Sequence, residues 1–399
     1  MEILKLSNLH SINSVVQSDV YLFNASNDSA LACNNLSYSP TKFVKVFEND
    51  LATLPMLFAT IYDIVLVNEQ PSDDFISQML ILGFKLPHFV TKDDFFEHQQ
   101  SLKYNLKALK PWGWSRTVHT IFRTVKQQFS KISVCSDWNP QLRDLSGRHT
   151  AATVLQTIIE QKLRFVLSES AIPKALKSVE TIPQLFSQNE RWVLKAPWSS
   201  SGRGLMRISP QRYDKTEQTW AQGIIDEQGF VMIEPWHEKV FDFSMLYSVT
   251  ADAISLLCFS SFKTNDKGQF LGSYVNWQEH TVFKEMGMSE IELNNLACIV
   301  AESLRKCNFQ NYYEGWIGVD AMVIRENGTL VIHPCVEINC RYTIGHLAYA
   351  FRQYFEPSSN ALLRIGSLHE YQDAKTLLDV RAITPITQKT QFVGWIDGY

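Results

Sequence analysis

Residues Gly318–His346, GVDAMVIRENGTLVIHPCVEINCRYTIGH, contain the strongest structural signal in the chain. Asn327-Gly328 lies between two apolar runs, and both residues tolerate the positive φ that a tight hairpin turn requires. The sequence therefore predicts two antiparallel strands joined by a two-residue loop. In that register Asp320 lies opposite Cys335 and diagonal to Glu337.

Polar side chains share one face of this predicted hairpin. Two-residue alternation places Asn339 with Asp320 and Glu337, and Arg341 follows if the strand continues. Carboxylate and amide oxygens at this spacing suit Mg²⁺ held between the protein and the phosphates of a nucleotide, with an arginine nearby to meet negative charge. The alternative is a solvated polar strand face with a surface ion pair. Separately, Pro334 is a residue that can shift the register of the second strand. Apolar residues of the second strand are expected on the other face, namely Val336, Ile338 and Ile332.

Composition limits the class of protein. The chain has 399 residues, 45% of them hydrophobic, which is enough for two or three domains with buried cores. A net charge of −4 and a pI near 6.2 do not indicate binding to nucleic acid or to an anionic membrane. The sequence shows neither an apolar run of about 18 residues nor a signal-peptide pattern. The seven cysteines lack a CxxC pair, which favours reduced thiols. We expect a soluble, cytoplasmic protein, and the sequence indicates no oligomeric state.

Buried strands alternate with helical spacing in the first part of the chain. Residues 19–24 and 61–67 have the composition of short strands, and the helical pattern of residues 74–82 ends before Gly83. This alternation predicts a parallel α/β layer. Turn residues at 137–140 separate this layer from the following part, so we expect one domain over residues 1–136 and a second over residues 137–399.

Two N-terminal segments are candidates for ligand contact. Residues Asn24–Asp28 follow the first strand, and ligands of open α/β sheets lie at the carboxyl ends of strands. The alternative is that Ser26 or Asp28 caps the next helix. No GxGxxG follows this strand, so a dinucleotide site is not expected. Residues 110–115, KPWGWS, form a rigid amphipathic corner that either packs two domains together or contacts a ligand.

A lysine beside a small-residue loop indicates a phosphate site. Residues 191–208, RWVLKAPWSSSGRGLMRI, predict a strand that carries Lys195, then a Ser/Gly loop, then a second strand over residues 205–208. Small residues allow backbone N–H groups to approach phosphate oxygens, and Lys195 adds a positive charge. A flexible hairpin without a ligand is the alternative, and GxxxxGK[ST] is absent. Upstream, Arg148 precedes a predicted helix over residues 150–167 and is by itself an ordinary exposed charge.

Two further acids follow on predicted strands. Residues 230–236 form a strand that ends at Glu234-Pro235, where Pro235 exposes neighbouring backbone groups suited to adenine recognition. Asp242 alternates with Phe241 and Phe243, so its carboxylate faces away from them and is available for ribose hydroxyls. A strand over residues 254–263 and an amphipathic helix over residues 289–306 lead to the hairpin.

Four of these segments occur in the order found in the ATP-grasp superfamily, which the chain resembles over about residues 140–350. The segments are VLKAPWSSSGRGL, IEPWHEKVFDFS, GVDAMV and EINCRYTIGH. The last is the most specific, because E-x-N-x-R is the metal- and phosphate-binding segment also present in biotin carboxylase and carbamoyl phosphate synthetase. The preceding part, with YLFNASND and KPWGWS, is similar to a domain of a poorly understood bacterial ATP-grasp group.

The resemblance implies a fold and a set of nucleotide contacts. It implies an N-terminal parallel α/β (pre-ATP-grasp) domain, residues 1–136, followed by a two-lobed ATP-grasp domain, residues 137–399. Lys195 would contact the α- and β-phosphates, Glu234 would lie at the adenine hinge and Asp242 near the ribose. A lid over the β- and γ-phosphates would contain Ser200, Ser201, Gly202 and Gly204. The link over residues 236–239 departs from the superfamily's glycine-bearing link.

The resemblance also implies metal and catalytic roles. Asp320, Glu337 and Asn339 would hold one or two Mg²⁺ (or Mn²⁺) ions. Arg341 would stabilise the transferred phosphoryl group or an acyl phosphate, where fixed positive charge acts on charge that develops in the transition state. Arg148 stands in the place of the superfamily's earlier ATP-binding lysine, keeping the charge with a different reach.

Three functions are consistent with these residues. The resemblance implies an ATP-dependent ligase that activates a small-molecule carboxylate as an acyl phosphate for an amine or another nucleophile, giving ADP and phosphate. A phosphotransferase that stops after the first step is the second function. A nucleotide-binding regulatory protein without turnover is the third, and the full set of metal-binding residue types with Arg341 counts against it.

Overall fold

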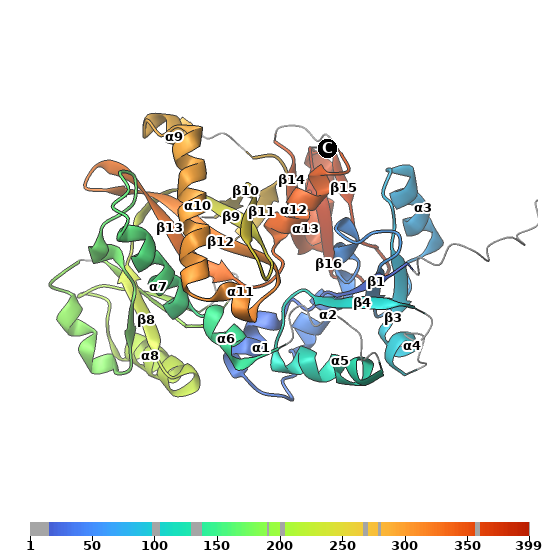
Figure 1. Cartoon of the computed structure of the whole chain (residues 1–399), viewed down its shortest axis with the longest axis horizontal. Helices are drawn as coiled ribbons and strands as arrows, with labels where there is room; N and C mark the ends of the chain where they lie inside the picture. Colours follow the sequence, from blue (N-terminus) through green and yellow to red (C-terminus); the bar gives the residue numbers. More distant parts are fainter. Residues whose placement is uncertain are drawn as a thin grey trace, which may run out of the picture.

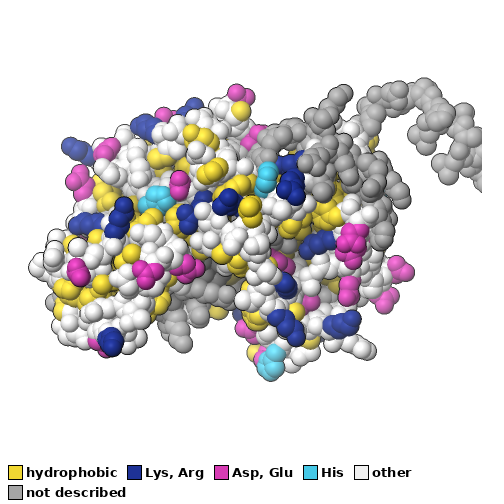
Figure 2. Space-filling view, turned by 90° about the horizontal axis from the view of Figure 1, so that it is seen from below, with side chains coloured by type: hydrophobic (Ala, Val, Ile, Leu, Met, Phe, Trp, Pro, Cys, Tyr) yellow, Lys and Arg dark blue, Asp and Glu magenta, His cyan; other side chains and the backbone are white. Residues whose placement is uncertain are grey.

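The computed structural model describes residues 16–97, 104–128, 138–189, 191–199, 204–265, 270–277, 281–355 and 360–398. These residues form three β-sheets with helices packed against them (Figure 1). Their described helices include none that is long and apolar enough to cross a membrane. On the face drawn in Figure 2, described Lys and Arg side chains are interspersed with Asp and Glu, so the charges do not gather into one basic area.

The described residues of the N-terminal sheet form four parallel strands in the order β3-β2-β1-β4. Its strands are β1 (Ser18–Leu22), β2 (Ile64–Val67), β3 (His88–Thr91) and β4 (Leu106–Pro111). Every residue of β1 and β2 is buried, as expected for parallel strands covered on both faces. The predicted parallel α/β layer is confirmed. Its helices are α1 (Asn27–Cys33), α2 (Lys42–Asp50), η1 (Leu54–Leu57), α3 (Asp73–Ile81), α4 (Lys92–Phe96) and α5 (Arg116–Gln128).

A small antiparallel sheet follows, in the order β5-β8-β6-β7. Its strands are β5 (Lys174–Leu176), β6 (Trp192–Lys195), β7 (Leu205–Ile208) and β8 (Val231–Pro235). The helix α8 (Lys215–Gln228) packs against it, and the buried core between them includes Trp192, Leu194 and Ile233. Short 3₁₀ turns flank the first of these strands: η3 (Glu169–Ala171) precedes β5, and η4 (Val179–Thr181) and η5 (Pro183–Leu185) lie between β5 and β6.

The third sheet is antiparallel and has eight described strands, in the order β13-β12-β9-β10-β11-β14-β16-β15. These strands are β9 (Glu238–Val249), β10 (Ile254–Thr264), β11 (Phe270–Tyr274), β12 (Gly315–Glu326), β13 (Thr329–Asn339), β14 (Leu362–Ser367), β15 (Val380–Ala382) and β16 (Phe392–Asp397). Its helices are α6 (Pro140–Leu145), α7 (Arg148–Ile159), α9 (Thr281–Glu285), α10 (Glu290–Lys306), α11 (Phe309–Tyr312), α12 (Ile344–Arg352) and α13 (Leu368–Leu377). Helices α7 and α10 cover one face of β13, β12, β9 and β10 (Figure 1).

The helix predicted over residues 150–167 is shorter than expected. It begins at Arg148 and ends at Ile159, and Lys162 then adopts a left-handed φ of 53°. That conformation cannot continue a right-handed helix. The apolar residues beyond it, Phe165 and Leu167, instead pack in an extended segment beside Ile332 of β13.

The β12–β13 hairpin has the predicted turn but not the predicted register. Asn327 and Gly328 have φ angles of 50° and 80°, and pairing is regular from the turn to Met322 opposite His333. A bulge then shifts the register, so Asp320 pairs with Glu337. The expectation that Asp320 faces Cys335 is wrong. Pro334, which has no backbone N–H to donate and which the sequence marked as able to shift the register, lies at the irregularity.

Candidate active site

A cleft of about 670 Å³ separates the small sheet from the large sheet. Its volume lies within the range of about 300–1,000 Å³ that is usual for small-molecule sites. The small sheet and its link to β9 contribute Arg191, Lys195, Arg207, Glu234, Trp236 and His237. The large sheet contributes Asp242, Phe262, Thr264, Tyr274, Met322 and Val336. Lys195, Glu234 and Asp242 therefore meet in one cleft, although they come from different strands.

Lys195 and Glu234 form a buried ion pair on adjacent strands. Lys195 lies at the end of β6 and Glu234 near the end of β8, and only 7% and 4% of the two residues is exposed. Burying two charges is costly unless they are paired, so each side chain holds the other at the cleft wall. A phosphate that approaches Lys195 would compete with Glu234 for the ammonium group.

Asp242 lies on the opposite wall of the cleft. Lys239 Nζ contacts its Oδ2 at 2.5 Å, and the Thr264 hydroxyl donates to the same atom at 2.9 Å. The Asp242 side chain is 14% exposed and that of Lys239 34% exposed, so this pair is more open to water than the pair on the other wall. Hydroxyl groups of a ligand could therefore reach the carboxylate.

The predicted metal-binding residues lie on the same sheet face, beyond Asp242. Asp242 on β9 pairs with Met322 on β12. Two residues further along β9, Ser244 pairs with Asp320 on β12, and Asp320 pairs in turn with Glu337 on β13. Asn339, opposite Gly318, follows two residues after Glu337 on β13. The alternation of strand side chains thus brings the predicted carboxylates and amide together.

Hydrogen bonds orient these three side chains. Ser244 Oγ donates to Asp320 Oδ1 at 2.5 Å, and Asn339 Nδ2 donates to Asp320 Oδ2 at 3.0 Å. Burial and the nearby Glu337 carboxylate raise the pKa of Asp320 to about 6, against the opposing effect of these hydrogen bonds. The Asn339 amide donates through nitrogen, so its carbonyl oxygen is available as a ligand.

The donor chemistry of this set fits Mg²⁺ or Mn²⁺. Among the described residues no group of three or more His, Cys, Asp and Glu side chains is placed to hold a metal, so the set depends on Asn339 as its third member. Two carboxylates and one amide provide the oxygen donors that Mg²⁺ prefers, with water and phosphate oxygens as further ligands. A divalent cation would also offset the repulsion that raises the Asp320 pKa.

Arg148 connects this set to the segment after β6. Its Nη1 donates to Ala196 O and Ser199 Oγ, both at 2.8 Å, and its Nη2 donates to Glu337 Oε2 at 2.8 Å. Only 8% of the residue is exposed. Sequence alone favoured an ordinary exposed charge, and the structure instead buries the guanidinium against the site.

Arg341 lies next to the same residues but is paired with Asp28. Its Nε donates to Asp28 Oδ1 at 2.9 Å and its Nη2 to Asp28 Oδ2 at 2.7 Å. Burial by itself would lower the pKa of the guanidinium, but Asp28 raises that pKa above its ordinary value. Arg341 and Asp28 line a small cavity together with Glu337 and Asn339.

The predicted lid is described only at its ends. Ser200, Ser201 and Gly202 lie outside the described residues. Gly204 has a φ of 71°, and its carbonyl accepts a 2.9 Å hydrogen bond from Ala196 N. A Cβ at Gly204 would lie 2.9 Å from the Ser199 Cβ, so the close approach of the two ends requires glycine here.

Val336 and His237, which line the cleft, and the buried His333 beside them were not predicted from the sequence. Val336 lines the cleft with Met322, so its assignment to the opposite face is wrong, because the bulge changes the alternation of β13. His333 is fully buried opposite Met322 and its ring packs against His237, with centroids 5.8 Å apart. Burial lowers the pKa of both imidazoles, which favours their neutral forms. The only sequence signal was Pro334, which marked the irregularity.

The two N-terminal candidate segments have defined places. The Ser26 side chain makes no capping hydrogen bond to α1, and Asp28 contacts Arg341. Trp112 and Trp114 are buried, which is the packing alternative for the KPWGWS segment.

Comparison with solved structures gives the fold. The chain is similar to an N5-carboxyaminoimidazole synthetase from Staphylococcus aureus complexed with ADP, with 10% identity and a TM-score of 0.50, covering 96% of this chain and 94% of that one. A biotin carboxylase–β,γ-ATP complex from Campylobacter jejuni has 12% identity and a TM-score of 0.53, with 97% and 89% covered. The biotin carboxylase domain of a Hydrogenobacter thermophilus 2-oxoglutarate carboxylase, with MgADP and bicarbonate, has 12% identity and a TM-score of 0.51, with 96% and 86% covered.

These likenesses extend over nearly the whole chain and confirm that it has the ATP-grasp fold, as its sequence resemblance implied. No family model matches the chain, and no curated protein matches it in sequence. At identities of 10–12% the solved structures establish the fold and not the reaction.

Proposed function

We propose that this protein is an ATP-dependent ligase that activates a carboxylate as an acyl phosphate for attack by an amine or another nucleophile. The observation that carries the proposal is that Asp242, which lines the cleft with Lys195, lies on the same sheet face as Asp320 and Glu337 in the next row of strand positions. Such a line of residues suits a nucleotide whose base and ribose lie in the cleft and whose phosphates point toward the carboxylates. The solved structures with ADP and MgADP share this fold.

Residues at successive positions along this sheet face and the cleft would bind successive parts of the nucleotide. The cleft between β8 and β9 would bind the base and ribose, with Asp242 accepting from ribose hydroxyls. Lys195 and Arg148 would bind phosphate oxygens, and Asp320, Glu337 and Asn339 would hold the metal. Bound Mg²⁺ or Mn²⁺ would offset phosphate charge. Arg341 would orient the transferred phosphoryl group or the acyl phosphate by charge-assisted hydrogen bonds.

The test is a screen that separates the three possible functions. The protein is incubated with Mg-ATP, pools of small carboxylates and hydroxylamine as a general nucleophile, and both ADP and hydroxamate are measured. A ligase gives ADP and hydroxamate only when the right carboxylate is present. A phosphotransferase that stops at the acyl phosphate would also give hydroxamate, so parallel reactions omit hydroxylamine: the phosphotransferase then still releases ADP and accumulates its phosphorylated product, whereas turnover of the ligase requires the nucleophile. A regulatory protein binds Mg-ATP in calorimetry without releasing ADP. Failure to bind Mg-ATP would rule out all three.

A further inference from the structure

We propose that Asp28 is the positioning residue for Arg341, and that the segments Asn24–Asp28 and Trp112–Trp114 fix this arginine so that it meets one oxyanion beside the metal-binding residues. The inference rests on the proposed function, in which Arg341 acts on a phosphoryl or acyl-phosphate oxygen. It gives the N-terminal part of the chain a role in the reaction.

Hydrogen bonds along one edge of the guanidinium group fix the orientation of the Arg341 side chain. Asp28 receives hydrogen bonds from both Nε and Nη2, at 2.7–3.1 Å, in the side-on arrangement that fixes the guanidinium plane. Nη1 donates to the Tyr342 carbonyl at 3.2 Å. Each of the two paired side chains is only 16% exposed. Rotation of Arg341 would therefore break a partly buried ion pair.

The number of remaining donors defines the ligand class. An arginine has five N–H donors, and these contacts use one on Nε, one on Nη2 and one on Nη1. Within the part of the chain that the structure describes, two N–H groups of Arg341 remain, one on each terminal nitrogen. They belong to a side chain that lines the same small cavity as Glu337 and Asn339. The cavity has a volume of about 10 Å³, room for about one water-sized group, so the arrangement suits a single oxygen of a phosphate or carboxylate group held between the arginine and the metal-binding residues.

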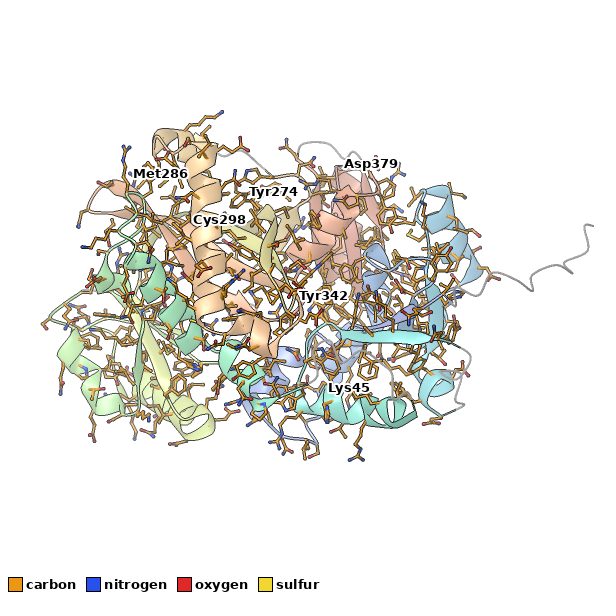
Figure 3. The ribbon with its side chains drawn as sticks, viewed as in Figure 1. Lys45, Tyr274, Met286, Cys298, Tyr342 and Asp379 are labelled. Carbon is orange, nitrogen blue, oxygen red and sulfur yellow. The ribbon has the colours of Figure 1, made fainter. Side chains whose placement is uncertain are left out.

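The backbone of Arg341 is held by the KPWGWS segment. Gly113 forms an isolated β-bridge with Arg341, and Tyr342 N donates to Trp112 O at 2.9 Å. Figure 3 shows Tyr342, the next residue after Arg341, in the middle of the molecule near β4. The two buried tryptophans anchor this segment, so the backbone position of the arginine depends on the N-terminal sheet.

The same segment also fixes the helix that carries Asp28. Asn24 Nδ2 donates to Gly113 O at 2.8 Å, and Asn27, in its hydrogen-bonded orientation, donates to Gly113 O and Trp114 O, both at 3.0 Å. A Cβ at Gly113 would lie 2.5 Å from Asn27 Cγ, so only glycine allows this approach. At the other end of α1, Arg143 Nε donates to Leu31 O at 2.7 Å. Both partners of the ion pair are thus positioned by one connected set of contacts.

The test uses two variants that alter geometry and leave every charge in place. Asp28→Glu lengthens the carboxylate arm by one methylene, and Gly113→Ala places a Cβ against Asn27. The first readout is the ¹H–¹⁵N resonance of the Arg341 Nε–H group, assigned by its loss in Arg341→Lys. We expect the resonance to shift or disappear in both variants. The Arg364 resonance, from an arginine paired with Asp397 at 3.2 Å, is the internal control and should not change.

The second readout is calorimetry with inorganic phosphate added to protein saturated with Mg-ADP. Because both variants conserve charge, a weaker phosphate affinity reports the position of the guanidinium. We expect the Kd for phosphate to rise about tenfold or more in each, the scale of loss for a misplaced binding group, while the Kd for Mg-ADP stays within about twofold. If Gly113→Ala does not fold, Asp28→Glu decides.

The outcomes separate this inference from the proposed function. An unchanged Arg341 resonance or an unchanged phosphate Kd in either folded variant overturns the positioning role. A wild-type protein that binds Mg-ADP but not phosphate also overturns it. A wild-type protein that does not bind Mg-ADP overturns the proposed function instead, and the resonance then still decides whether Asp28 positions Arg341.

Discussion

Asp320 and Glu337 are direct cross-strand partners between β12 and β13. Two carboxylates placed opposite each other repel, which ordinarily destabilises a sheet. Here Ser244 and Asn339 donate to Asp320, and Arg148 donates to Glu337, so the repulsion is reduced without being removed. A pair maintained in this way is suited to a cation, and its titration in the absence of metal is testable.

In EDTA, the wild-type protein should lose stability relative to Asp320→Asn as pH rises from about 4 to 6. Burial and the Glu337 carboxylate raise the Asp320 pKa from 3.8 to about 6 in the folded state. Below pH 4 the group is protonated in both states and contributes nothing, whereas above pH 6 it is ionised in both and the folded state is disfavoured. A gap of about two pKa units is worth at most about 3 kcal/mol, and less where water screens the carboxylate.

Urea unfolding of the two proteins at several pH values measures this difference. Mg²⁺ should reverse it at pH 7, because an ion that binds only the folded wild type stabilises it by mass action. A difference in unfolding free energy that is constant from pH 4 to 7 would contradict the raised pKa.

The hairpin illustrates what the sequence could predict and what it could not. Local chemistry determines the turn, because Asn327 and Gly328 are residue types that accept positive φ, and it correctly indicated the two strands. The register depends on how β13 accommodates Pro334, and spacing alone gave Cys335 as the partner of Asp320. The error also misplaced Val336, which lines the cleft.

Contacts between distant parts of the chain were beyond reach from one sequence. Asp28 and Arg341 are 313 residues apart, and each was noted for a different reason. The same holds for Arg148, whose contact with Glu337 spans 189 residues. Periodicity identifies the faces of strands and helices, but it does not show which faces meet.

Lys195→Met should destabilise the protein and weaken Mg-ATP binding. Glu234 is 4% exposed, and removing Lys195 leaves its carboxylate buried without a partner, which costs about 3–5 kcal/mol. The double variant Lys195→Met/Glu234→Gln should recover much of the stability, because no unpaired charge remains, but it should not recover nucleotide affinity. Urea unfolding and calorimetry with Mg-ATP measure the two effects separately.

Lys239→Met is the matched control for stability. Lys239 pairs with Asp242 on the same cleft, but its side chain is 34% exposed, so the loss should be at most about 1 kcal/mol. Unchanged Mg-ATP affinity in folded Lys195→Met would remove the assignment of β6 to phosphate binding.

Arg148→Lys should lower both stability and Mg-ADP affinity although it preserves the charge. The guanidinium donates to Ala196 O, Ser199 Oγ and Glu337 Oε2, and an ammonium group cannot serve these acceptors together. The unfolding free energy should fall by about 1–3 kcal/mol, the cost of leaving buried acceptors unsatisfied.

Arg305→Lys, on an exposed part of α10, should stay within about 0.5 kcal/mol of the wild type. Among the described residues, Arg305 pairs with Glu302 at 3.8 Å, and its side chain is 45% exposed. Equal losses in the two variants would show that Arg148 has no special role.

Glu337→Gln should separate catalysis from nucleotide binding. The substitution keeps the size of the side chain and an oxygen that accepts from Arg148, but it removes a negative metal ligand. The substitution should therefore destabilise the transition state more than the complex with nucleotide. The rate of ADP release should fall by roughly 10²-fold or more, the scale for losing one group that stabilises developing charge. Asn339→Ala should behave alike, and the double variant should cost less than the sum of the singles, because both residues serve one site.

Ile332→Val is the control for the Glu337 variants, because it changes an apolar residue of the same strand that does not line the cleft. Val336 lines the cleft, so a substitution there could alter ligand binding directly. Ile332 is fully buried on β13 and packs in the core, away from the cleft residues. It should lose about 0.5–1.5 kcal/mol of stability and leave the rate of the folded protein unchanged. The assay is ADP production with the substrates that the hydroxylamine screen identifies, beside a thermal melt of each variant. Full activity in folded Glu337→Gln would discard the catalytic role of the hairpin and favour a regulatory protein that binds nucleotide without turnover.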